Sequence, residues 1–206
     1  MPLFYQQIIH ENTKLAIWKI EENESFFLQK IPLKKNISHP HKRLQHLAGR
    51  YLLPLLFDDF PLEEIIVADS RKPFLKNETY HFSISHCGEY AAAIASSTDR
   101  VGIDIELYSD KVIKVKDKFL NHDEAQFAMQ YGNDKKLLTT LWNAKEAAYK
   151  WYSYGLLNFR EHILLHPVSF KNEGNIPAAL LKENEKFSFD IHYSLFENLS
   201  LAWISA

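Results

Sequence analysis

The stretch VGIDIE, which begins at Val101, constrains the fold of this chain more than any other. Its aliphatic residues, Val101, Ile103 and Ile105, alternate with two acids, Asp104 and Glu106. Because side chains alternate across a strand, the aliphatic residues predict one buried face, and the two acids share the other face roughly 7 Å apart. Acids at that distance repel each other unless a positive charge lies near them. The ordinary interpretation is a solvated strand face, and the alternative is a site that holds a cation.

Composition narrows the classes of protein. The chain has 206 residues, of which 46% are hydrophobic, and this is enough for one core or two small ones. A formal charge of −2 requires no nucleic acid and no anionic membrane as partner, and the single cysteine, Cys87, excludes an intramolecular disulfide. No signal-peptide pattern and no apolar run of about 18 residues is present. The sequence predicts a cytoplasmic globular protein that binds neither nucleic acid nor membrane.

Hydrophobic periodicity predicts an α+β fold with two similar α/β lobes, residues 1–99 and 100–206. Strands are expected at 15–20, 64–69, 80–86, 90–96, 101–107, 162–170, 187–193 and 199–205. Helices are expected at 36–57, 112–131 and 135–152. A hairpin turn is expected at Gly88. Pro54 should kink or end the first helix, because proline lacks the backbone N–H that a helix interior needs.

The stretch LWNAKEAAYK offers a partner for the two acids. On a helix, Trp142, Glu146 and Lys150 share one face. Taken alone, Glu146 and Lys150 would be an ordinary helix-stabilising pair worth about 0.2–0.5 kcal/mol. Taken with Asp104 and Glu106, they complete a set of oxygen ligands without thiols, which suits Mg²⁺. Lys150 would then be available to bind a phosphate oxygen, so the combination indicates phosphoryl chemistry.

The stretch FSISHCG places a hydroxyl and an imidazole beside a glycine turn. Ser85, His86 and the backbone N–H groups of the turn could bind an anion. Nucleophilic catalysis by this pair is disfavoured, because adjacent residues of a strand point to opposite faces. In the stretch SRKPF, Arg71 and Lys72 precede Pro73, which stiffens the loop. A charged loop of this kind is ordinarily only solvated.

The motifs VGIDIE, WNAKEAAYK, RKP and FSISHCG, spread over residues 40–155, resemble the 4′-phosphopantetheinyl transferase superfamily. The group that matches best is the surfactin-synthetase-activating type, a monomer in which one chain carries both lobes of a pseudo-dimer. Such enzymes transfer the 4′-phosphopantetheine group of coenzyme A to a serine of an apo-acyl or peptidyl carrier protein. The products are the holo-carrier protein and adenosine 3′,5′-bisphosphate.

The resemblance implies roles for individual residues. Asp104, Glu106 and Glu146 would be ligands of Mg²⁺, with Mn²⁺ as a substitute. Glu146 and Lys150 would be catalytic: Lys150 would contact the pyrophosphate, and Glu146 would accept the serine proton directly or through a bound water. Glu124 matches an acid that lies near the metal in some members. Its sequence context also has the form of a helix-capping box, and that alternative stays open.

The coenzyme A contacts that the resemblance implies lie mostly in the first half of the chain. Ser85 and His86 would touch phosphates, and Lys72 and Pro73 would lie near the adenine. Arg43 is the choice for the 3′-phosphate, with His41 and Lys42 as alternatives. The family often has Ser or Thr at the position of Cys87, so one hydroxyl contact would be absent here.

Two rival functions remain. The first is a non-catalytic module that binds coenzyme A or a carrier protein. The second is another magnesium-dependent phosphotransferase, although the chain has no GxxxxGK[ST] motif to cradle a nucleotide phosphate. A carrier protein would present acidic helices by family resemblance. The densest run of basic residues that could meet them is Lys111, Lys114, Lys116 and Lys118, whose ordinary interpretation is a solvated helix face.

Overall fold

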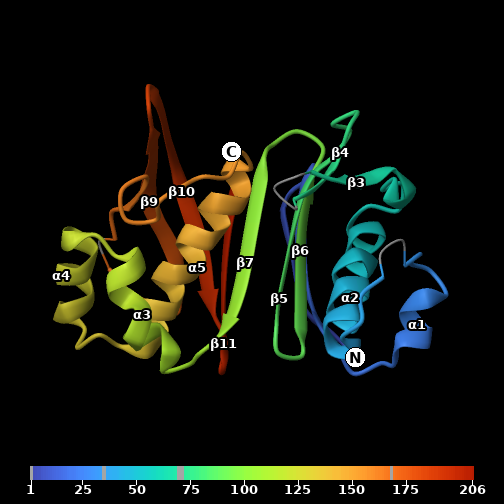
Figure 1. Cartoon of the computed structure of the whole chain (residues 1–206), viewed down its shortest axis with the longest axis horizontal. Coiled ribbons are helices and arrows are strands. Elements are labelled where there is room, and N and C mark those ends of the chain that lie inside the picture. The colour runs from blue at the N-terminus through green and yellow to red at the C-terminus, as the bar shows by residue number, and fades with distance from the viewer. Residues whose placement is uncertain (1, 34–35, 69–71, 168) are drawn as a thin grey trace. The chain divides into compact units, whose positions relative to one another are not determined.

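A computed structural model of the chain describes residues 2–33, 36–68, 72–167 and 169–206. The expected α+β class is confirmed: antiparallel sheets carry long helices. The chain separates into two compact units (Figure 1). Unit 1 is Met1–Val101 with Ser205, and unit 2 is Gly102–Ile204 with Ala206. No helix in the described part of the chain is long and apolar enough to cross a membrane.

Unit 1 is built on a four-stranded antiparallel sheet with the order β1-β2-β6-β5. The strands are β1 (Leu3–His10), β2 (Thr13–Lys19), β5 (His81–Cys87) and β6 (Tyr90–Ser96). The expected hairpin joins β5 to β6, with Cys87 opposite Tyr90 and Gly88 at a φ of 47°. That positive φ suits glycine, which has no Cβ to clash.

Helix α2 (Pro40–Leu56) packs on this sheet. It begins at Pro40 because proline is tolerated in the first turn and because the His39 side chain accepts a hydrogen bond from the backbone N–H of Lys42. Its buried stripe includes Leu47, Leu52 and Leu56. Pro54 lies inside the helix, which continues to Leu56, so Pro54 does not end α2, and a kink at this position stays a prediction.

Short elements complete unit 1. They are α1 (Glu24–Leu28), the 3₁₀ turn η1 (Leu62–Glu64) and the two-stranded sheet of β3 (Ile65–Val67) and β4 (Pro73–Leu75). The sequence analysis did not predict β1, α1 or β4. α1 and β4 are too short to show a hydrophobic period, and β1 carries polar residues on both faces.

Unit 2 is built on a five-stranded sheet with the order β7-β11-β10-β9-β8. Its strands are β7 (Val101–Leu107), β8 (Ile163–Leu165), β9 (Glu173–Lys182), β10 (Glu185–Leu195) and β11 (Leu199–Ser205). The sequence analysis missed β9 and expected a longer β8. Its helices are α3 (Lys111–Phe119), α4 (His122–Gln130) and α5 (Lys135–Tyr152), where one helix had been expected over 112–131. The chain breaks there because Asn121 starts a new helix with a capping box.

Helix α5 organises the core of unit 2. The side chain of Asp134 caps it by accepting from the backbone N–H of Leu137. Leu138, Leu141, Ala144 and Ala148 are fully buried and share a core with residues of β8, β10 and β11. Figure 1 shows α5 running along the sheet of unit 2. This packing fixes which side chains of α5 remain available for chemistry.

Candidate functional site

The two acids of β7 do not lie on a solvated strand face. Val101, Ile103 and Ile105 are buried, as their pattern predicted. Asp104 is also buried, with only 4% of its surface exposed, and Glu106 is half-buried. Taking a carboxylate out of water is costly unless a positive charge or hydrogen bonds compensate it. The ordinary interpretation of this strand is therefore wrong.

Lys150 supplies a positive charge to β7. Its Nζ donates to Oδ1 of Asp104 at 2.7 Å and to the carbonyl oxygen of Ile103 at 3.1 Å. The side chain of Lys150 keeps 25% of its surface exposed, whereas that of Asp104 keeps 6%. The side chain of Lys150 is thus held against the strand and is only partly enclosed.

Glu106 and Glu146 join the same electrostatic cluster. Burial, with repulsion from Asp104 as the next cause, raises the pKa of Glu106 to about 7, while Lys150 and a hydrogen bond from Trp142 act in the opposite direction. Burial and then Asp104 likewise raise the pKa of Glu146 to about 7, again opposed by Lys150. Three acids share one lysine here. We call Asp104, Glu106, Glu146 and Lys150 the acidic cluster.

The donor chemistry of the acidic cluster fits a hard divalent cation. All its acidic side chains offer carboxylate oxygens, and the pKa values of Glu106 and Glu146 are raised first by burial and then by repulsion from Asp104. The side-chain arrangement is not that of a closed metal site. Within the described ranges, no three His, Cys, Asp or Glu side chains are grouped so that they could hold a metal ion.

Glu124, the remaining acid that the sequence analysis proposed, serves the fold. Its Oε2 accepts from the backbone N–H of Asn121 and forms an ion pair with Lys145 Nζ at 2.7 Å, and its Oε1 accepts from the backbone N–H of Leu165. Both side chains of the ion pair are fully buried. The capping-box alternative is confirmed: Asn121 and Glu124 cap α4 reciprocally.

An aromatic pocket of about 510 Å³ lies beside the acidic cluster, because Trp142 lines the pocket and hydrogen-bonds to Glu106. Trp142 packs against Phe119 and Phe159 with ring centroids 5.2 and 5.5 Å apart. Val115, Lys118 and Asn158 complete the lining. The sequence analysis missed this pocket, since its walls come from α3, α5 and the loop before β8, and no single motif contains them.

Ser85 and His86 lie in β5 of unit 1. Ser85 is 6% exposed, whereas His86 is exposed, as expected for neighbours that point to opposite faces of a strand. A nucleophile and a base must share a hydrogen bond. The alternation in β5 therefore argues against Ser–His nucleophilic catalysis by this pair.

The three basic residues near the start of α2, His41, Lys42 and Arg43, differ in exposure and in hydrogen bonding. Arg43 Nε donates to Oε1 of Glu24 at 2.7 Å, and Nη1 donates to the carbonyl oxygen of Ile37 at 2.9 Å. The hydrogen bond to Glu24 raises the pKa of Arg43. Lys42 is exposed and His41 is half-buried. The guanidinium of Arg43 thus joins α2 to the segment before it.

Lys72 belongs to a crowd of positive charge in unit 1. Burial, followed by repulsion from Arg100, lowers the pKa of Lys72 to about 8. Burial also lowers the pKa of His81, with smaller contributions in the same direction from Arg100 and Lys72. Pro73 is the first residue of β4, and Arg71 lies outside the described residues. The sequence analysis missed Arg100, which follows β6 without a motif.

Arg50 of α2 lines a second cavity of about 170 Å³. Its Nη1 lies 3.1 Å from Nδ1 of His46, and burial lowers its pKa. The remaining lining is apolar and comes from Ile31, Pro32, Leu62, Ile65 and Val67. Arg50 is thus a half-buried cation with an apolar surround.

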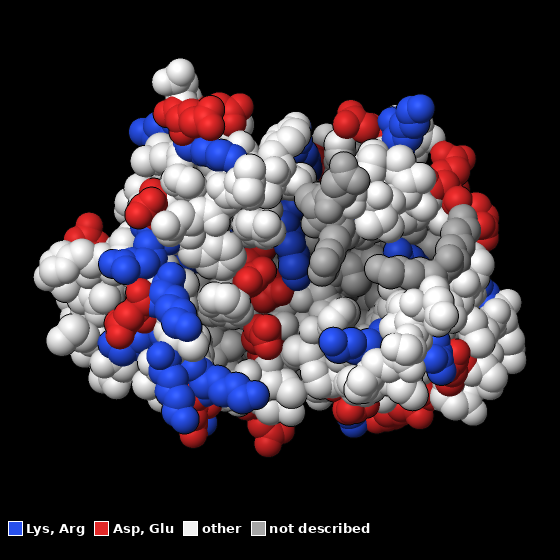
Figure 2. Space-filling model, viewed as in Figure 1, with Lys and Arg blue, Asp and Glu red and all other residues white. Residues whose placement is uncertain are grey.

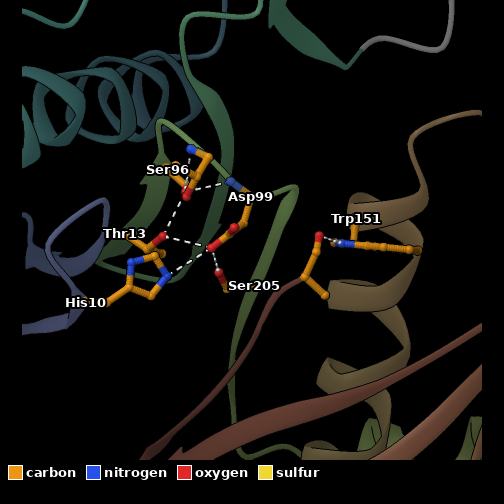
Figure 3. Close-up of polar contacts among 8 residues, drawn as sticks. His10, Thr13, Ser96, Asp99, Trp151 and Ser205 are labelled. Atoms are coloured by element: carbon orange, nitrogen blue, oxygen red, sulfur yellow. Dashed lines mark hydrogen bonds and ion pairs between the residues drawn. The ribbon is translucent and has the colours of Figure 1, made fainter.

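Several polar side chains of unit 1 form hydrogen bonds with Asp99 (Figure 3). Oδ2 of Asp99 accepts from Ser205 Oγ at 2.8 Å and from Thr13 Oγ1 at 3.3 Å, and it lies 2.9 Å from His10 Nε2. Burial acts to raise the pKa of Asp99, but its hydrogen bonds, that from Ser205 foremost, leave it lowered. His10 and Ser205 both bond to the same acid, whereas a catalytic triad places the histidine between serine and acid. This group is structural.

Comparison with known proteins agrees with the motifs of β7 and α5. The family model of the 4′-phosphopantetheinyl transferase superfamily matches residues 100–204. A curated relative, 4′-phosphopantetheinyl transferase gsp of Aneurinibacillus migulanus, is 31% identical over 114 residues. That match covers 53% of this chain and 46% of the relative, so the chain spans about half the length of the curated relative it matches. Since the family model covers half of the chain, the chain belongs to the 4′-phosphopantetheinyl transferase superfamily.

Proposed function

We propose that this chain transfers the 4′-phosphopantetheine group of coenzyme A to a serine of an apo-carrier protein in a Mg²⁺-dependent reaction. The products are the holo-carrier protein and adenosine 3′,5′-bisphosphate. The observation that carries the proposal is the acidic cluster, in which three half-buried or buried carboxylates share one lysine. Family membership supplies the reaction class.

Asp104, Glu106 and Glu146 are the proposed ligands of Mg²⁺. When bound there, the ion would neutralise the charge of the pyrophosphate as the leaving group departs. Burial and then repulsion from Asp104 raise the pKa of Glu106 and of Glu146, and a bound cation would oppose both effects. Lys150 is held at Asp104 with a partly exposed ammonium group, which suits a contact with a pyrophosphate oxygen.

Glu146 is the proposed general base, directly or through a water. The serine Oγ attacks the β-phosphorus of coenzyme A, the bond from that phosphorus to the bridging oxygen breaks, and adenosine 3′,5′-bisphosphate leaves with the electron pair. The serine proton passes to the base. Burial and then repulsion from Asp104 raise the pKa of Glu146 to about 7 in the metal-free chain, and a bound cation would favour the ionised carboxylate that can accept a proton.

Residues of unit 1 are proposed to bind the nucleotide half of coenzyme A. Lys72 and Arg100 repel each other, so an anionic part of coenzyme A nearby would stabilise both, and by family resemblance Lys72 and Pro73 lie near the adenine. By family resemblance, Ser85 and His86 contact phosphates and Arg43 contacts the 3′-phosphate. The lobe of residues 1–99 would thus contribute to coenzyme A binding, and the lobe of residues 100–206 would contribute catalysis.

The aromatic pocket is the proposed place of the pantetheine arm. It adjoins the acidic cluster through Trp142, and its volume of about 510 Å³ suits a flexible chain of moderate polarity.

For the carrier protein we propose the basic face of α3. Figure 2 shows Lys and Arg side chains gathered over the part of unit 2 that carries α3. Acidic partners are attracted to such a face at low ionic strength.

The test is direct. The chain is incubated with coenzyme A, Mg²⁺ and a panel of apo-carrier proteins from fatty-acid, polyketide and peptide synthesis, and intact masses are measured. We expect at least one carrier to gain the mass of one phosphopantetheine group. Binding of coenzyme A without any transfer would identify a non-catalytic binding module instead. Hydrolysis of ATP without consumption of coenzyme A would identify a nucleotide phosphotransferase.

A further inference from the structure

Gly102 lies in β7 at the point where α5 crosses the strand. A Cβ built on Gly102 would overlap the carbonyl oxygen of Ala147 and would lie 2.8 Å from the backbone nitrogen of Trp151. Both are main-chain atoms of a helix, so they cannot turn aside as the end of a side chain can. Ala147 is fully buried and Trp151 is 5% exposed. The absence of a side chain at Gly102 therefore allows the main chain of α5 to touch β7.

This contact lies in the same turns of α5 as the acidic cluster. Glu146 precedes Ala147 and Lys150 precedes Trp151, so each contact atom is next to a residue of the cluster. A helix moves as a rigid body over two turns, since its backbone hydrogen bonds link successive turns. Any displacement of α5 at Gly102 would therefore be transmitted to Glu146 and Lys150.

We propose that Gly102 is a positioning residue that sets the spacing of α5 from β7 and so holds Glu146 and Lys150 against Asp104. The inference rests on the proposed transferase function. Non-bonded carbon atoms need about 3.5–4.0 Å of separation, so a Cβ at Gly102 would displace α5. A displacement of about 1 Å in reacting groups can lower a rate by about 10²-fold.

The test compares Gly102→Ala with Gly49→Ala. Gly49 lies in α2 of unit 1, where a new Cβ would meet the end of the Ile84 side chain at 2.6 Å, so both variants add one crowded methyl group. For Gly102→Ala we expect kcat to fall by about 10–100-fold while KM for coenzyme A stays within about threefold. Gly49→Ala should retain kcat. Thermal melts without coenzyme A or Mg²⁺ show the cost of each methyl group to the fold.

A double-mutant cycle with Lys150→Met separates positioning from general damage. If Gly102 acts by placing Lys150, removal of Lys150 should cost much less kcat in the Gly102→Ala background than in the wild type. A purely structural glycine would give additive losses instead. A folded Gly102→Ala chain with kcat within twofold of wild type, or an additive cycle, overturns the proposal.

Acetylation of Lys150 tests the position of α5 without measuring transfer, so this result does not depend on the proposed function. Lys150 donates to Asp104 at 2.7 Å, so brief acetylation followed by peptide mass spectrometry should modify it slowly in the wild type and several-fold faster in Gly102→Ala. Exposed Lys111 should react equally in both chains, and buried Lys145 in neither. Equal rates at Lys150 overturn the proposal, even if the wild type transfers nothing. If Gly102→Ala does not fold, Ala147→Val, which adds bulk at a fully buried position in the same turns of α5, is measured in its place by the same criteria.

Discussion

Helix α5 carries two charged clusters through adjacent residues, Lys145 and Glu146, and the clusters are built in opposite ways. The ammonium group of Lys145 has three donors, and all three are used by Glu124, the Phe159 carbonyl and the Ile163 carbonyl. Glu124 in turn accepts from Lys145 and from two backbone N–H groups. One positive and one negative charge are buried together, and each hydrogen-bonding group of the pair has a partner.

The acidic cluster one residue further along α5 is unbalanced. Asp104, Glu106 and Glu146 lie around one lysine, Lys150, and burial followed by repulsion from Asp104 raises the pKa of Glu106 and of Glu146 to about 7. A saturated ion pair has nothing to gain from a ligand, whereas crowded acids are stabilised by any added cation. We therefore infer a structural role for the first cluster, and the second is the one that we propose for binding and catalysis.

The largest effect is expected from breaking the saturated pair. Lys145→Met leaves the Glu124 carboxylate buried without its charge partner, and such losses cost about 3–5 kcal/mol of folding free energy. Urea denaturation measures the change. In the double variant with Glu124→Gln, much of the loss should be recovered, because no charge then remains buried. A single variant as stable as the wild type would show that the pair is not essential to the fold.

Asp104→Ala should lower the transfer activity strongly and the folding stability little, which is the reverse of the effect expected for Lys145→Met. It removes the acid that raises the pKa of both Glu106 and Glu146, and the buried aliphatic face of β7 is unchanged. We expect transfer to fall by about 10²-fold or more with little loss of folding stability, since a proposed metal ligand is lost and charge repulsion is relieved. Carrier modification followed by intact mass, together with a urea melt, measures both. Wild-type transfer at low Mg²⁺ would refute the metal assignment.

Lys150→Ala sharpens the distinction between binding and catalysis. The ammonium is proposed to meet the pyrophosphate where charge develops, so its loss should lower kcat by about 10–100-fold and weaken coenzyme A binding less. Steady-state kinetics and calorimetric titration with coenzyme A give the two quantities. Equal losses in kcat and in affinity would make Lys150 a docking residue only.

Glu146→Gln tests the charge imbalance by its effect on stability. Glu146 ionises near pH 7 in the folded chain and near 4.5 when unfolded, so the folded state binds more protons between these values. The metal-free wild type should therefore lose stability as the pH rises from about 4.5 to 7. Glutamine removes one charge at nearly the same volume, so above pH 7 it should raise metal-free stability by on the order of 1 kcal/mol. Melts at pH 5 and pH 8 without divalent ions show whether the gain appears only at the higher pH.

Sequence patterns predicted the structure best where the pattern lies within a single strand or helix. The alternation in VGIDIE predicted the buried aliphatic face of β7, and the helical spacing of Glu146 and Lys150 predicted that they share a face of α5. The motifs also identified the family, which the comparisons confirm. Patterns failed for β9 and for the break between α3 and α4, since a local cap and strand pairing outweighed the hydrophobic period.

By itself, the sequence determined the α+β class and the family, because these depend on residue types at short, regular spacings, whereas the roles of the candidate site residues stay predictions. Only the tertiary structure decided what each charge does. Glu124 and Glu146 are both acids of α-helices in unit 2, yet one is saturated by Lys145 and backbone N–H groups while the other is crowded by Asp104. Burial and partners from distant segments set the pKa of a carboxyl group, and no local pattern of residues contains that information.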